Sequence, residues 1–277
     1  MSITTTNISD LNTYGFVILE NYNYNFKLMA FLKDKILELP EKENVYMNYY
    51  SYENNSYQLH LSQNFLEYQE NIKRFKEYCA DSIARTILNG DVNLFSEKLV
   101  AKLPNMGDTN VTQQQYLLKD YPPNRYITVC VPVNGLSPEV GSMFIASGIS
   151  KDKTIYQTAE SPTIDKALLK SWNWKDIALN LDDILVIDSY APFYNNPNFS
   201  STTSYMFYFT YNLDSEGNHR DTYYTKQRET HIPNQEMVAA IKEAERLEQL
   251  RIEHEEQARL DADRLSQEQH ELENNIN

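Results

Sequence analysis

The stretch Ile127–Lys151, ITVCVPVNGLSPEVGSMFIASGISK, decides the fold that we expect of this chain. Its segments ITVCVPV and GSMFIAS are short and apolar, and NGLSPEVG between them has the Gly, Pro, Asn and Ser of a turn. Similar short segments recur from Leu99 to Asn212, separated by turn sequences such as YNNPN. A series of short strands joined by turns predicts a β-sandwich or jelly roll.

Two segments that precede these strands have apolar residues three or four positions apart, which is the spacing of a helix. They are Phe26–Leu39, which ends before Pro40, and Leu61–Asn89, which ends at Asn89-Gly90. Helices first and strands later indicate an α+β protein. We expect its helices to pack on one side of the β core.

The chain changes character at Pro233. Residues 234–274 contain no Pro or Gly and are rich in Glu, Gln and Arg, so they predict a long charged C-terminal helix. Its apolar positions form only a broken seam, which favours a solvated helix over a coiled coil. We therefore divide the chain into a globular domain, residues 1–232, and a charged tail, residues 233–277.

Composition limits the partners and the compartment. The net charge of −14 argues against binding to nucleic acid or to an anionic membrane, because phosphate recognition needs clustered Lys and Arg. Cys79 and Cys130, the two cysteines, fit buried free thiols in a reducing compartment. No apolar run has the length of a membrane span and no secretory signal is visible at Met1–Asp10, so we expect a cytoplasmic protein.

The order and spacing of the strand segments resemble the phytanoyl-CoA dioxygenase family of iron(II)- and 2-oxoglutarate-dependent oxygenases. YGFVIL (Tyr14–Leu19) and LVAKLP (Leu99–Pro104) resemble two of its strands, and DDILVIDSYAPFYNNPNFSS (Asp182–Ser201) resembles a later segment. FTYNLDSEGNHRDTYYTKQR (Phe209–Arg228) resembles a segment that follows the core in one branch. The resemblance implies a double-stranded β-helix, the jelly roll of cupin-like proteins.

The positions that hold the metal in this family carry other residues here. The family's H-x-D motif falls on Gln113–Gln115, its second His on Phe193, and the Arg that clamps the cosubstrate on Ser204. No histidine occurs between His60 and His219, so a small shift of the alignment restores nothing. Iron of this type needs two imidazoles and one carboxylate. We therefore expect no metal, no cofactor and no catalytic residue at these positions, only a pocket lining: Gln113, Gln115, Tyr116, Tyr190, Phe193, Ser204 and Tyr205.

Three functions remain open. The first is a catalytically inactive oxygenase-like protein, a pseudoenzyme, that binds a small molecule through amides and rings or binds a protein partner. The second is an active member of the oxygenase family with a non-standard or relocated metal site, whose candidate ligands are Asp120, Asp188, Tyr116 and Tyr190. The third is a scaffold or a secreted effector that docks a partner through its acidic C-terminal helix.

Overall fold

The computed structural model describes residues 3–22, 24–39, 46–51, 57–106, 111–113, 121, 125–149, 170–230, 243, 246–247 and 249–259. The chain divides into two compact units. One comprises Met1–Tyr50 and Leu59–Glu229, and the other comprises Ser51–Gln58 and Thr230–Asn277. The boundary that we predict between residues 232 and 233 stays a prediction.

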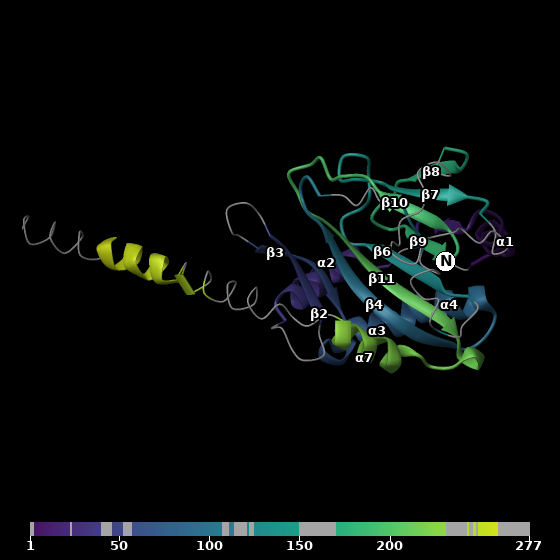
Figure 1. Ribbon diagram of the computed structural model, residues 1–277, viewed down its shortest axis with the longest axis horizontal. Coiled ribbons are helices and arrows are strands. Elements are labelled where there is room, and N and C mark those ends of the chain that lie inside the picture. Colours follow the sequence, from purple (N-terminus) through teal and green to yellow (C-terminus); the bar gives the residue numbers. More distant parts are fainter. Residues whose placement is uncertain are drawn as a thin grey trace, which may run out of the picture. The chain divides into compact units, whose positions relative to one another are not determined.

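Two β-sheets together form the predicted jelly roll (Figure 1). The seven-stranded sheet has the order β1-β9-β6-β11-β4-β3-β2, and the four-stranded sheet has the order β5-β10-β7-β8. The strands are β1 (Phe16–Leu19), β2 (Tyr46–Ser51), β3 (Tyr57–Gln63), β4 (Val92–Lys102), β5 (Thr112–Gln113), β6 (Ile127–Pro132), β7 (Met143–Ser147), β8 (Asn173–Ile177), β9 (Ile184–Asp188), β10 (Pro192–Asn195) and β11 (Ser204–Leu213).

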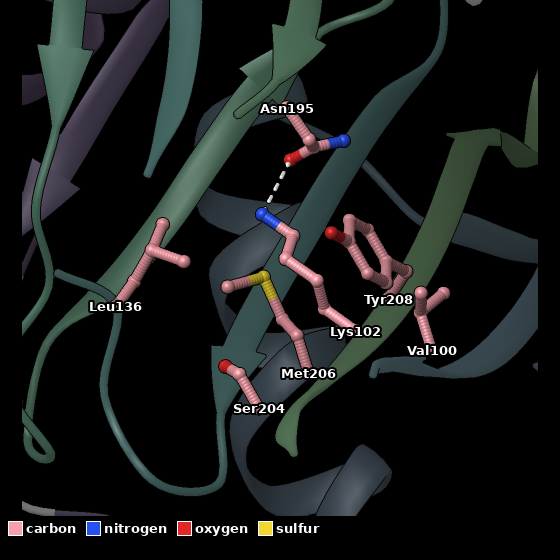
Figure 2. A pocket seen from close by; sticks show the side chains of 7 residues that line it. All are labelled: Val100, Lys102, Leu136, Asn195, Ser204, Met206 and Tyr208. Carbon is pink, nitrogen blue, oxygen red and sulfur yellow. Dashed lines mark hydrogen bonds between the residues drawn. The ribbon is translucent and has the colours of Figure 1, made fainter. Parts of the chain in front are cut away.

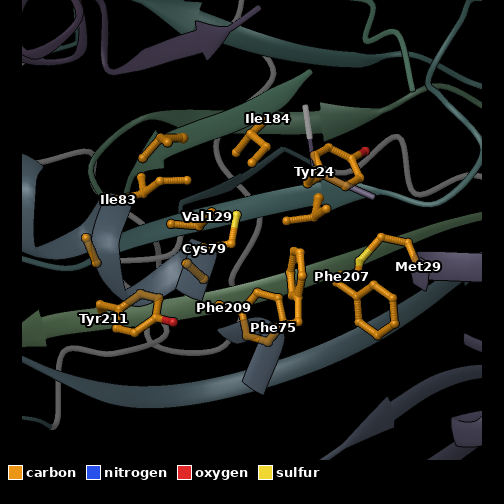
Figure 3. Close-up of a cluster of buried hydrophobic side chains, with 14 of the residues drawn as sticks. Tyr24, Met29, Phe75, Cys79, Ile83, Val129, Ile184, Phe207, Phe209 and Tyr211 are labelled. Atoms are coloured by element: carbon orange, nitrogen blue, oxygen red, sulfur yellow. The ribbon is translucent and has the colours of Figure 1, made fainter. Parts of the chain in front are cut away.

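Helices cover the outer face of the seven-stranded sheet, which confirms the α+β prediction (Figure 3). Apolar side chains from α2 and from the segment η1–α4 form one buried cluster with those of β1, β4, β6, β9 and β11. The helices are α1 (Thr5–Tyr14), α2 (Phe26–Leu37), the 3-10 turns η1 (Leu66–Tyr68) and η3 (Asp214–Glu216), α3 (Glu70–Phe75), the π-helix η2 (Lys76–Ala80), α4 (Asp81–Leu88) and α7 (Arg220–Thr230).

Strand β11 lies at the centre of the large sheet and alternates between its two faces. Phe207 and Phe209 belong to the cluster under the helices, whereas Met206 belongs to a second cluster that fills the space between the sheets. This second cluster also contains Met143 of β7 and Ile177 of β8, from the small sheet. Successive side chains of a strand point to opposite faces, so even-numbered positions from Ser204 to Tyr208 face the interior of the jelly roll.

The smaller unit contains a described helical stretch, residues 249–259, whose side chains are exposed. Residues 231–242 and 260–277 lie outside the described part of the chain, so the length of the C-terminal helix and its role in docking a partner stay predictions. Among the helices that are described, none is both long enough and apolar enough to cross a membrane.

Candidate functional site

A small cavity lies between the two sheets, near the first residues of β11 (Figure 2). Its volume is about 40 Å³, slightly more than the roughly 30 Å³ that one water occupies in the liquid. It could hold a water or the head of a carboxylate. Strands β4, β10 and β11 and the loop after β6 supply its lining: Val100, Lys102, Leu136, Asn195, Ser204, Met206 and Tyr208.

Lys102 is the one charged side chain in this lining. Its Nζ donates to the carbonyl oxygen of Gly141 and, at 3.5 Å, to Oδ1 of Asn195, and it meets no carboxylate in the described part of the chain. Burial lowers the pKa of Lys102 to about 8. A half-buried ammonium with only neutral partners costs free energy, and an anion in the cavity would offset that cost.

The register of the sheet places Lys102 directly opposite Ser204. Both side chains lie on the inner face, as do Val100 and its partner Met206. In Figure 2 the polar ends of Lys102, Asn195 and Tyr208 lie around the same space. The cavity therefore combines one cation with neutral hydrogen-bonding groups, which is a set that suits an anion.

Gly141 has no side chain, and this leaves space for the side chain of Lys102. A Cβ at this position would lie 2.4 Å from the carbonyl oxygen of Asn196 and 2.9 Å from Cδ of Lys102. The backbone has φ +83, a conformation that favours glycine. The turn between β6 and β7 thus needs a residue without a side chain where it passes the lysine.

Replacing Gly141 with alanine is expected to destabilise the protein by about 2 kcal/mol or more, through overpacking and the positive φ. Urea unfolding of the variant measures this. Gly148 is the matched control, because its φ is +76 but a Cβ there would meet nothing within 4 Å. Equal losses for both alanine variants would show that Gly141 matters through φ alone and that the close approach to Lys102 has no effect.

The predicted metal-site positions lie on adjacent strands of the small sheet. The backbone of Gln113 on β5 pairs with Pro192 on β10, and Phe193 pairs with Thr112 on one side and Ile145 on the other. The ring of Phe193 is half-buried and packs against the cluster between the sheets. The side chain of Gln113 and all of Gln115 and Tyr116 lie outside the described residues.

Two other predicted lining residues differ in their placement. Ser204 lines the cavity and is buried. Tyr205 does not: it lies on the opposite face of β11, packs against the cluster under the helices, and has the ammonium of Lys33 4.9 Å from its ring centroid. Its assignment to the pocket was wrong, because adjacent residues of a strand cannot face the same side.

Tyr190 follows β9, and its backbone N–H donates to Oδ1 of Asp188 at 3.1 Å. Burial and then the charge of Asp188 raise the pKa of Tyr190. Asp188 also accepts a hydrogen bond from Nε of Arg125 at 2.7 Å. An arginine-paired carboxylate at a strand end is a structural group, and Asp188 is therefore a poor candidate for a relocated metal ligand.

An iron site of the family's kind does not fit the residues that the structure describes. Within them, no group of three or more His, Cys, Asp or Glu side chains could hold a metal ion. Phe193 cannot coordinate a metal, and Asp120 lies outside the described residues. The donor set of the cavity suits a carboxylate, whereas the described positions of the family's metal ligands do not suit iron.

Sequence reasoning missed a buried ion pair that connects α7 to the large sheet. Glu97 on β4 is fully buried and is bound by Arg220, one of whose guanidinium nitrogens lies 2.8 Å from Oε1 of the carboxylate. Arg220 also donates to Oδ1 of Asn64 at 2.7 Å. The HRD triplet at residues 219–221 therefore contributes an arginine to the packing of α7. The two partners lie 123 residues apart, and no local pattern relates them.

No family model matches this chain. It is 28% identical over 232 residues to a 2-aminoethylphosphonate dioxygenase of an uncultured bacterium, covering 81% of this chain and 87% of that protein. It is 26% identical over 135 residues to a methylphosphonate hydroxylase of Gimesia maris, covering 49% of this chain and 51% of that protein. The structure of EctD from S. alaskensis with 2-oxoglutarate and 5-hydroxyectoine aligns with a TM-score of 0.64 at 13% identity, over 77% of each chain.

These matches agree with the resemblance to oxygenases of the phytanoyl-CoA dioxygenase type, and they overturn two of our predictions. The pseudoenzyme prediction is wrong, because the two relatives are named as a dioxygenase and a hydroxylase and nothing about them indicates an inactive protein. The expectation of no cofactor is wrong as well, since structures of similar fold were solved with Fe and with α-ketoglutarate. Missing histidines showed which ligands are absent, but not that the chemistry is absent.

Proposed function

We propose that this protein is an active oxygenase of the iron- and 2-oxoglutarate-dependent type, with a non-standard metal site, that hydroxylates a small phosphonate. The relative that covers most of both chains is named for a reaction on 2-aminoethylphosphonate, and the second for methylphosphonate. Among solved structures of similar fold, the epimerase SnoN is in complex with Fe3+ and alpha ketoglutarate, and EctD is bound to 2-oxoglutarate and 5-hydroxyectoine. The names of the relatives therefore support a phosphonate as the substrate, and the cavity supports 2-oxoglutarate as the cosubstrate.

The observation that carries the proposal is the position of Lys102. In the family that this sequence resembles, an arginine clamps the distal carboxylate of 2-oxoglutarate. The matching position in this chain is Ser204. Lys102 lies directly across from Ser204 on the neighbouring strand and faces the same cavity. The positive charge thus lies on β4, the strand next to the family's arginine position on β11, and it still faces the interior. A lysine attracts a carboxylate as a point charge, without the two-pronged fork of an arginine.

The neutral groups around Lys102 would complete the carboxylate site. The hydroxyl of Ser204 and the phenol of Tyr208 can each donate one hydrogen bond, and the side-chain amide of Asn195 can donate two. When bound, 2-oxoglutarate supplies the electrons for oxygen reduction by losing CO₂ and becoming succinate. The cavity residues bind and orient it and keep water from its distal carboxylate.

The test is succinate formation from 2-oxoglutarate by the purified protein, with Fe(II), Mn(II) or Co(II) and with or without a phosphonate. We expect turnover that depends on a divalent metal and that rises when methylphosphonate or 2-aminoethylphosphonate is added. Three metals are compared because a site with fewer imidazole ligands shifts metal preference. If none of them gives succinate above the level of protein-free controls, the proposed function fails.

Binding of 2-oxoglutarate is expected to depend on pH through Lys102. Because burial lowers the pKa of this lysine to about 8, its ammonium loses its charge as the pH rises through that value. Affinity should therefore be constant below this pKa and fall roughly tenfold per pH unit above it. Calorimetry across both ranges measures this, and proton uptake on binding should appear only above the pKa. Affinity that stays constant throughout would exclude Lys102 as the binding cation.

A further inference from the structure

A second polar row crosses the inner face of the large sheet, next to the cavity. The registers pair Gln63 of β3 with Lys98 of β4, and Lys98 with Tyr208 of β11. Lys98 lies on the inner face because Val100 and Lys102, two and four residues further along the strand, line the cavity. Directly opposite residues have Cβ atoms about 5 Å apart, so the three side chains are neighbours.

None of these side chains has an anionic partner in the described residues. Lys98 is half-buried, and no hydrogen bond or ion pair engages its ammonium within the part of the chain that the structure describes. Gln63 is only 4% exposed, and its side-chain oxygen is buried without a hydrogen-bond partner. A buried polar atom without a partner costs about 1–3 kcal/mol. A ligand that contacts the Gln63 amide would offset this cost.

The row matches the chemistry of a tetrahedral oxyanion. A phosphonate head presents three oxygens that accept hydrogen bonds, and the row offers an ammonium, a phenol and an amide. The amide of Gln63 presents its NH₂ group after a half-turn about its last side-chain bond, an exchange of two groups of nearly equal size. The row contains no acidic side chain that would repel the ligand.

We propose that Gln63, Lys98 and Tyr208 bind the phosphonate head of the substrate, separately from the keto-acid carboxylate at Lys102; naming this ligand as the substrate rests on the proposed function. Lys98 and Lys102 are four residues apart on β4, which corresponds to roughly 13 Å along the strand. Each lysine can therefore neutralise its own anion. Tyr208 lies between the two sites, since it lines the cavity and pairs with Lys98, and its single O–H donates to one of the two anions at a time.

Calorimetric titration of the full-length protein with methylphosphonate tests this inference, with dimethyl methylphosphonate as an uncharged probe of similar shape. We expect wild-type protein to bind methylphosphonate and not the neutral ester. Lys98→Met should weaken methylphosphonate binding at least about tenfold, which is 1.4 kcal/mol, while 2-oxoglutarate affinity stays within about twofold. Gln63→Leu should weaken it less, because it removes a neutral donor. Lys175→Met, on an exposed position of β8, is the matched control and should bind as wild type.

The following results would contradict the phosphonate site. Equal affinity of wild type and Lys98→Met for methylphosphonate overturns the proposal, as does equal binding of the neutral ester. Binding of 2-oxoglutarate without any binding of methylphosphonate overturns it as well and leaves the keto-acid site standing. Binding of neither ligand would overturn the proposed function together with this site.

Discussion

Replacing Lys102 with methionine is expected to weaken the binding of 2-oxoglutarate by about 100-fold or more, because the one charged side chain in the described lining of the cavity is lost. The same substitution should stabilise the unliganded protein by on the order of 1 kcal/mol. Burial lowers the folded-state pKa of Lys102, so the charged form opposes folding at every pH below that pKa. Methionine fills similar space without the charge. Calorimetry and urea unfolding measure the two effects.

The combination of weaker binding and greater stability separates a ligand-binding role from a structural one. If Lys102 served only the fold, through Gly141 and Asn195, its removal would lower stability and leave ligand affinity unchanged. Lys175→Met again serves as control and should change neither quantity. A Lys102→Met variant that binds 2-oxoglutarate as tightly as wild type would contradict the assignment of the cavity.

Replacing Arg220 with methionine is expected to cost about 3–5 kcal/mol of unfolding free energy, because it leaves the carboxylate of Glu97 buried without its charge partner. Glu97 would keep only the backbone N–H of Leu66 at 3.2 Å and the phenol of Tyr224 at 3.4 Å. The double variant Glu97→Leu/Arg220→Met should recover most of the loss, since it buries no unpaired charge. Urea unfolding of the single and double variants measures both.

The matched control is Arg85→Met. Arg85 lies 4.0 Å from Asp91 in an exposed pair, and exposed pairs contribute between zero and about 1 kcal/mol. A loss below this level for Arg220→Met, or a double variant as unstable as the single one, would show that the buried pair does not hold α7 to the sheet.

Local patterns were sufficient to predict most of the elements. The alternation around β11 and the stop signal at Asn89, which adopts the left-handed conformation with φ +54, are local properties of the sequence. The helix Phe26–Leu39 appears as α2 with nearly the same bounds. The helix that we expect to begin at Leu61 begins later. Leu61 lies within strand β3, and the helical segment begins at Leu66 and contains a π-helical turn. Leu59 and Leu61 alternate with polar residues, as in a strand, and Leu61 pairs with Val100 of β4.

The candidate site could be predicted only in part. Aligning the motif positions identified Ser204, which lines the cavity, but Lys102 was missed. A lysine in an alternating strand usually faces solvent, and only the pairing of β4 with β11 and the cover of the small sheet turn it inward. The same reasoning applies to Lys98 and Gln63, whose neighbours come from strands far apart in the chain. The function was misjudged for a related reason: absent ligands are visible in a sequence, whereas their spatial replacements are not.

A crystal structure of the protein with 2-oxoglutarate would show whether Lys102 binds the distal carboxylate. We expect the distal carboxylate to lie between the sheets, within about 3 Å of Nζ of Lys102 and beside Ser204 and Tyr208. A keto acid bound elsewhere, or a cavity that still contains only the contacts of Lys102 to Gly141 and Asn195 at saturating ligand, would contradict it.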